Sequence, residues 1–390
     1  LDASFTPQDA RQNVRLSLAA RDLAGDFGSL SRLEANASVA DALGAARLEA
    51  SATAREFRQN DLNVAQLRLN VAGTPEQLTV SSTVEGQMME PFALDARAQL
   101  ALGEAVRLRL EQLTGQVADK PLRLVGPAEV TVGDEMRLSG LNLELAGARL
   151  RADASIGTEV AVEATLEDLS LALLADFGAP ALTGQANAKL QMSGPVGNPG
   201  GTALVTVTGL RSPDPAFADL PPARLTANAA LAQRRLSVDL RGEGVSDRPV
   251  VLTAALPVVL QLEPFRFELP DGPLDGRLDA ELQLARLADI AGLDGDRLEG
   301  RLGAALSLAG TSTDPQLNGT VSIADGIYEN GTTGTVLHDL TLRARARQQR
   351  LTIEAFSAND GGSGRLSGEG TVELDPAASF PVDLRLALRR

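Results

Sequence analysis

Cysteine and tryptophan are absent from this chain of 390 residues, and aromatic side chains make up only 3% of it. Without cysteine the chain has no disulfide, no thiol nucleophile and no thiolate metal site. The only histidine, His338, excludes metal sites built from several histidines. Because large rings are scarce, Leu, Val, Ile and Ala have to supply most of the apolar burial.

Positive charge is also limited, since 36 Lys and Arg residues face 51 Asp and Glu residues, which leaves a net charge of −15. Nucleic-acid binding needs a basic stripe, so this charge argues against it, and anionic membrane surfaces are disfavoured by the same sign. The longest mostly apolar stretch, residues 250–262, is too short to span a bilayer. The chain begins at Leu1 and shows no targeting signal, so we expect a soluble piece of a longer protein.

Motifs of known catalytic and phosphate-binding loops are missing from the sequence. His338 and Asp339 are adjacent in an expected strand, so their side chains point to opposite faces and do not form a catalytic pair easily. Residues 294–299 and 359–364 partly match the patterns of calcium-binding loops but depart from them, and we interpret both as turns. We therefore expect no enzyme, no catalytic residue, no metal site and no cofactor.

Strict alternation of apolar and polar residues dominates what is present. Leu141, Leu143 and Leu145 alternate with polar residues, and the same pattern occurs in residues 106–111, 150–156 and 382–389. Such alternation is typical of antiparallel strands with one solvated face. At about one strand per 10–12 residues, the chain is long enough for on the order of 30 strands.

Two stretches favour short amphipathic helices instead, residues 169–177 and residues 280–290, because Leu or Ala recurs three and four apart. They share a Leu-Ala-x-Leu-Ala-Asp core, and strand motifs downstream of each recur at nearly the same offset, which indicates a repeat of about 115 residues. We therefore expect a degenerate β-sheet segment over residues 1–140 and two repeated modules over 141–279 and 280–390, joined in one elongated sheet.

Two interpretations of the apolar strand face stay open. It is either an ordinary core, covered by a second sheet or by the short helices, or an open groove for a long hydrophobic ligand such as an acyl chain. Open sheets of more than about ten strands tend to curl, and curling about the apolar face makes a trough.

Residues 310–374 resemble the TamB group of the AsmA-like family. The resemblance rests on Gly326-x-Tyr328-x-Asn330, on Gly334-Thr-Val336-Leu337-x-Asp339-Leu340 and on the glycine-rich run that begins at Gly361. It implies a long curved antiparallel β-sheet, called a β-taco, with an open apolar trough that holds phospholipid chains. It also implies a periplasmic location, an inner-membrane anchor elsewhere in the parent protein, and a partnership with the outer-membrane barrel TamA.

Our leading hypothesis is a non-enzymatic segment that shields phospholipid acyl chains during transport between the inner and outer membranes and supports outer-membrane protein assembly. The expected groove-lining residues are Leu141, Leu143, Leu145, Leu225, Leu236, Val238, Val321, Ile323, Leu340, Leu342, Leu351, Ile353, Leu384, Leu386 and Leu388. The alternative is a scaffold that spans the periplasm and templates barrel proteins along its strand edge without carrying lipid.

Overall fold

The structure is a computed structural model that describes residues 2–8, 11–25, 28–42, 46–211, 221–244, 248–284, 296–373 and 381–389. These residues form 27 β-strands and one short α-helix, and the paired strands run antiparallel. The expected mostly-β class is therefore confirmed. The chain divides into two compact units, the first formed by Leu1–Ala181 with Ala186–Val196 and the second by Leu182–Gln185 with Gly197–Arg390.

The first unit contains β1–β13, α1 and most of β14. Its elements are β1 (Asp2–Gln8), β2 (Arg11–Gly25), β3 (Gly28–Ala40), β4 (Arg47–Gln59), β5 (Leu62–Thr74), β6 (Gln77–Gln87), β7 (Pro91–Ala101), β8 (Val106–Val117), β9 (Lys120–Leu124), β10 (Ala128–Val132), β11 (Met136–Leu145), β12 (Ala148–Ile156), β13 (Glu159–Ser170), α1 (Leu171–Ala175) and β14 (Thr183–Pro195). Strands β1 to β8 pair in chain order, and the short strands β9 and β10 both pair with β8 on one side and β11 on the other. The sheet then continues through β12 to β13.

The second unit contains β15–β27. Its strands are β15 (Gly200–Arg211), β16 (Ala223–Ala232), β17 (Arg235–Glu243), β18 (Val250–Pro257), β19 (Val259–Leu262), β20 (Phe265–Glu268), β21 (Asp275–Gln283), β22 (Asp296–Gly310), β23 (Pro315–Asn330), β24 (Val336–Arg347), β25 (Arg350–Asn359), β26 (Arg365–Glu373) and β27 (Val382–Arg389). They pair in chain order, except that β18 pairs directly with β21. The intervening β19 and β20 form a separate two-stranded hairpin.

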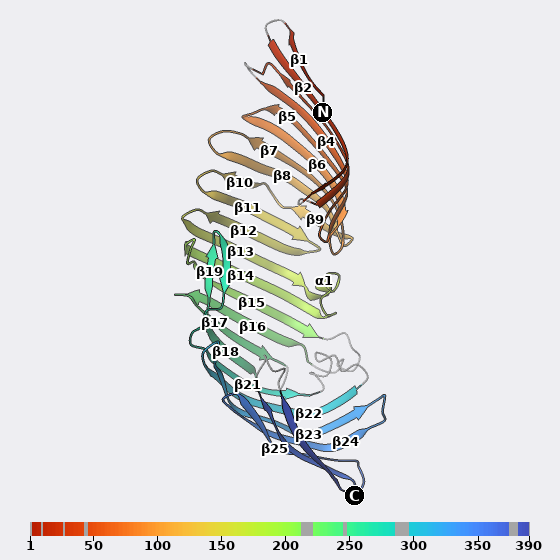
Figure 1. Cartoon of the computed structure of the whole chain (residues 1–390), viewed down its shortest axis with the longest axis vertical. Helices are drawn as coiled ribbons and strands as arrows, with labels where there is room; N and C mark the ends of the chain where they lie inside the picture. The colour runs from red at the N-terminus through yellow and green to blue at the C-terminus, as the bar shows by residue number, and fades with distance from the viewer. Residues whose placement is uncertain are drawn as a thin grey trace. The chain divides into compact units, whose positions relative to one another are not determined.

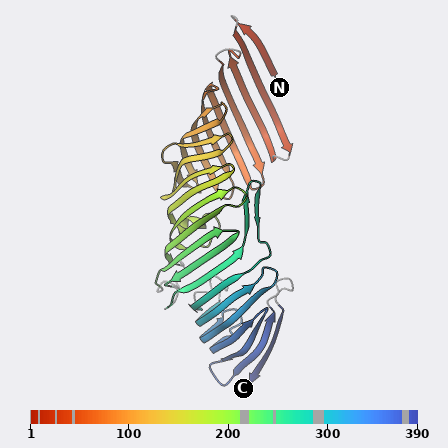
Figure 2. The same ribbon diagram turned by 90° about the vertical axis from the view of Figure 1, so that its left-hand side faces the viewer.

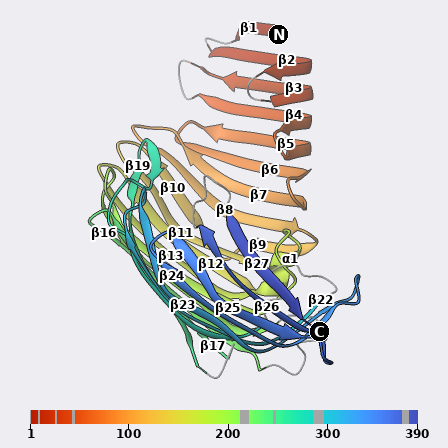
Figure 3. The same ribbon diagram turned by 60° about the horizontal axis from the view of Figure 1, so that its bottom comes forward.

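The sheet of each unit is a single layer. Every pair of described elements in extensive contact is a pair of ladder neighbours, apart from α1, which contacts β13. Figures 1 and 2 show the strands of each unit stacked in chain order, and Figure 3 shows them bending along their length. Such curvature is expected, because open sheets of this many strands twist and curl.

The two expected helices have different outcomes. The first is present but shorter than expected: α1 covers Leu171–Ala175, with Leu171 and Leu173 buried, and Gly178 with a φ of +80° follows it. A glycine with positive φ is a common helix stop.

The prediction of a second helix over residues 280–290 is wrong for its first four residues. Ala280 and Leu282 belong to β21 and lie opposite Ala304 and Leu302 of β22, so cross-strand apolar pairing outweighs the helical spacing. Residues 285–290 lie outside the described residues. The boundaries of the expected repeat modules, at residues 140 and 279, fall inside β11 and β21, and the modules remain a prediction.

Candidate functional site

Apolar side chains form an unbroken row across the second unit. In an antiparallel ladder, directly paired residues point to the same face, so the strand registers trace rows perpendicular to the strands. One row crosses all eleven strands of the main ladder and contains only apolar residues and one glycine. Its members are Val205, Ala227, Leu240, Leu252, Leu278, Leu306, Gly319, Ala346, Leu351, Val372 and Val382.

The first unit contains an equivalent row. It crosses eleven strands from β2 to β13, bypassing β9, and again has no polar side chain. Its members are Val14, Val39, Leu48, Gly73, Leu78, Leu100, Leu108, Val130, Leu138, Ala154 and Val162. We call the side of each sheet that carries such a row its apolar face.

The opposite side of each sheet is polar. The row directly beside the second-unit apolar row consists of Thr206, Thr226, Arg241, Val251, Asp279, Ala305, Thr320, Arg345, Thr352, Thr371 and Asp383. Ion pairs between alternate residues of one strand recur here, as in Arg277 Nε to Asp279 Oδ2 at 2.6 Å and Arg241 Nε to Glu243 Oε1 at 2.8 Å. The hydrogen bond from Arg241 lowers the pKa of Glu243. The polar side is thus a solvated surface.

Burial distinguishes the apolar faces from an ordinary core. Within the described residues, buried side chains are all hydrophobic, and many of them are alanines such as Ala344 and Ala346. Apart from Leu78, which is 2% exposed, the larger side chains of the rows are half-buried, as Leu278 and Leu351 are, or exposed. Leucines between two packed sheets are normally fully buried, so these faces have no second layer of described residues upon them.

All fifteen expected groove residues lie on the apolar faces. Leu141, Leu143 and Leu145 lie there in β11, and the others lie in six strands of the second unit. The placement of these residues therefore agrees with the alternation in the sequence. That this face holds lipid remains a prediction.

Two bulges preserve this arrangement where simple alternation fails. In β25 the register shifts between Ile353 and Phe356, so both face the apolar side although they are three residues apart. In β24 Asp339 has a φ of +48° next to a register shift, and Leu340 beyond it lies on the apolar side and is 8% exposed. A bulge adds one residue to a strand and re-aims the side chains beyond it.

An apolar hollow in the first unit was not anticipated from the sequence. It has a volume of about 300 Å³ and lies over strands β2 to β5. Alanines of β3 and β4 form its floor, and larger side chains of β2 and β5 form its walls. The lining side chains on the apolar face are Leu16, Leu18, Ala35, Ala37, Ala50, Ala52, Leu69 and Val71. Alternating alanines in the sequence mark the floor of this hollow. Alanine also occurs in helices and turns, so these residues alone do not predict a groove.

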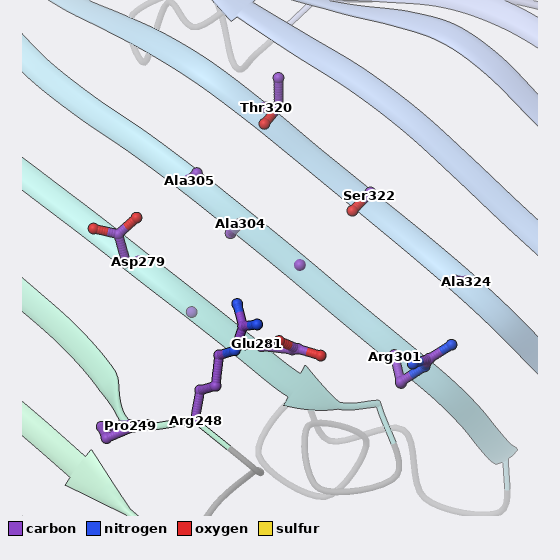
Figure 4. A pocket seen from close by; sticks show the side chains of 12 residues that line it. Arg248, Pro249, Asp279, Glu281, Arg301, Ala304, Ala305, Thr320, Ser322 and Ala324 are labelled. Atoms are coloured by element: carbon purple, nitrogen blue, oxygen red, sulfur yellow. Dashed lines mark ion pairs between the residues drawn. The ribbon is translucent and has the colours of Figure 1, made fainter.

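A second hollow, of about 510 Å³, lies among β21, β22 and β23 and is shown in Figure 4. Charges of both signs line it, including Arg248, Asp279, Glu281 and Arg301. Arg248 Nε lies 3.9 Å from Glu281 Oε2, and Arg301 forms an ion pair with Asp325. This lining suits water or ions better than a hydrocarbon chain.

Comparison of the sequence with family models and with curated proteins finds no match. The resemblance to the TamB group thus remains a prediction. Over the residues that the structure describes, no helix has the length and apolarity needed to cross a membrane. Clusters of three or more potential metal-ligating side chains are likewise not found in that part of the chain.

Proposed function

We propose that the chain is a non-enzymatic lipid-shielding segment whose apolar faces cover the acyl chains of phospholipids. The observation that carries this proposal is the apolar row, which runs over eleven strands in each unit without a polar side chain and whose larger side chains, apart from Leu78, are half-buried or exposed. Each acyl CH₂ group removed from water contributes about 0.8 kcal/mol. A continuous row offers similar burial at every strand, so a lipid can move along it without large changes in free energy.

The cellular setting is part of the same proposal. We expect a periplasmic segment of a TamB-like parent protein that is anchored in the inner membrane, carries phospholipid towards the outer membrane and acts with the barrel TamA in outer-membrane assembly. The resemblance of residues 310–374 supports this setting. Transport of this kind requires no catalytic group, because the hydrophobic effect supplies the binding free energy.

Site-specific photo-crosslinking tests the proposal. A photoreactive residue is placed at Ile353, on the apolar face, and in a matched variant at Thr352, on the polar face, in the full-length protein in cells. Phospholipid captured at Ile353 and not at Thr352 is the expected result. Equal capture at both positions, or capture at neither while the protein is folded, contradicts lipid shielding by this face.

A scaffold is the second candidate, and strand β27 favours it. β27 pairs only with β26 among the described residues, and its apolar side chains Leu384, Leu386 and Leu388 are 45%, 56% and 83% exposed. An uncovered edge with these side chains is a template for another strand. A barrel-protein strand crosslinked at β27, with no lipid at Ile353, would favour this candidate.

A further inference from the structure

The apolar face of the second unit extends beyond the main sheet at the end of β18. Leu252, Ala254 and Leu256 of this strand lie on the apolar face. Val258 continues the alternation, and its backbone N–H donates to the carbonyl oxygen of Arg234 at 2.8 Å, so the ladder with β17 extends to this point. Val258 is only 1% exposed. The residue at the junction between sheet and hairpin is therefore fully buried.

The hairpin formed by β19 and β20 has an apolar face of its own. Leu260 lies opposite Phe267 and Leu262 lies opposite Phe265, so all four side chains share one side. The alternation of β18 thus passes through Val258 into Leu260 and Leu262. Phe265 and Phe267 are 74% and 56% exposed. They are two of only ten phenylalanines in the chain, both placed in one strand of four residues.

The other side of the hairpin is polar, and the two charges of its ion pair cancel. Arg266 Nε contacts Glu268 Oε1 at 2.6 Å, and Gln261 lies opposite Arg266. The hairpin is a separate two-stranded sheet, and Figure 1 shows its strands running in a different direction from those of the second-unit sheet. A two-stranded hairpin with an uncovered apolar face is only marginally stable in water, so a ligand that covers this face stabilises it.

We infer that the apolar face of the β19–β20 hairpin is a binding site for the acyl chain of a phospholipid, at the strand-end rim of the second-unit sheet. This inference rests on the proposed lipid-shielding function. Two observations favour a hydrocarbon chain as the ligand. The apolar alternation of β18 runs on through Val258 into the hairpin, and Leu260, Leu262, Phe265 and Phe267 present no charged group to a headgroup. Aromatic rings supply large contact areas with few rotatable bonds.

The test uses the full chain, purified away from membranes and loaded with a phospholipid whose acyl chain carries a radioactive label. Photoreactive residues are placed singly at Phe267, at Gln261 on the opposite side of the hairpin, and at Ile353 in the main sheet. We expect Phe267 to capture at least about tenfold more label than Gln261, in keeping with burial of one large apolar contact. We also expect the double variant Phe265→Ser/Phe267→Ser to release bound lipid about tenfold faster with unchanged circular dichroism, since both rings are exposed.

The outcomes separate this inference from the function on which it rests. Capture at Ile353 with no excess at Phe267 over Gln261 overturns the hairpin site and leaves the lipid-shielding function standing. Absence of label at all three positions contradicts both. In a third possible result, Phe267 captures no label in the vesicle-free complex, yet the chain floats with phosphatidylcholine vesicles and the double serine variant does not. This result would identify a bilayer surface as the occupant and would also overturn the inference.

Discussion

Gly319 of β23 lies so close to β22 that a β-carbon built on it would be 2.0 Å from the carbonyl oxygen of Ala305. Its φ is +136°, in the region that side-chain-bearing residues rarely adopt. Gly319 is also the only glycine of the second-unit apolar row, between Leu306 and Ala346. The row remains continuous there because the two backbones approach closely, which no larger residue allows.

Gly319→Ala is expected to lower the free energy of unfolding, with the backbone strain alone costing on the order of 1–3 kcal/mol. The clash with the Ala305 carbonyl adds to this cost. Urea unfolding followed by circular dichroism measures the change. Gly197→Ala is the control, because a β-carbon there meets nothing within 4 Å and no positive φ occurs. Equal stability of the two variants would contradict the close approach at Gly319.

Ala50→Phe is expected to fill the alanine-floored hollow of the first unit and to reduce the amount of phospholipid that co-purifies with the chain. The hollow has only about 300 Å³, and Ala50 lies at its floor between Ala37 and Val71. Lipid extraction and mass spectrometry measure the bound amount per chain. The matched control, Thr53→Phe, puts the same ring on the polar side of β4 at a residue that does not line the hollow. Equal lipid content in the two variants would show that this hollow holds no lipid.

Asp271 is expected to titrate below its ordinary pKa of 3.8, because it accepts hydrogen bonds. The hydrogen bond from the Thr313 hydroxyl lowers this pKa most, followed by that from the Thr311 hydroxyl. Asp271 Oδ1 lies 2.9 Å from Thr313 Oγ1. Since the folded-state pKa is depressed, the stabilisation is present above the unfolded pKa and is lost as pH falls through the folded pKa.

Carbon-detected NMR titration of the carboxylate measures this pKa directly. Asp271→Asn should remove the corresponding part of the acid-induced loss of stability, and Asp275→Asn, for which no such hydroxyl contacts are found among the described residues, serves as the control. A pKa of Asp271 at or above 3.8 would contradict the hydrogen-bonded arrangement.

Leu386→Lys is expected to reduce self-association of the chain. Leu386 is 56% exposed in β27, whose outer edge pairs with no described strand, and an inward-pointing lysine is a common means of protecting such an edge. Sedimentation velocity over a range of concentrations measures the effect. Ala387→Lys, on the polar side of the same strand, is the control. A monomeric wild-type chain at high concentration would contradict this prediction.

The sequence by itself predicted which side of several strands is apolar. Leu351 and Ile353 alternate with Thr352, and the period of two in a strand sends them to opposite faces whatever the neighbouring strands are. The fifteen residues expected from this rule share the apolar faces for that reason. The same rule does not locate Phe356, because the bulge that follows Ile353 changes the parity, and a bulge depends on the partner strand.

Alternation also leaves ambiguous any segment that fits two periods. Residues 280–283 match both a helix and a strand, and only the presence of Leu302 and Ala304 across the ladder selects the strand. The β19–β20 hairpin is similar, since its sequence continues the β18 pattern without indicating that the chain leaves the sheet after Val258.

The sequence thus determined the strand-rich class, the scarcity of rings and the chemical character of each face, because these follow from residue type and a local period of two. The tertiary structure decided which apolar residues line up into rows, where alanines leave a hollow, and that the apolar face of each sheet lacks a second layer of described strands. These features depend on strand register and curvature, which are set by contacts between residues distant in the sequence.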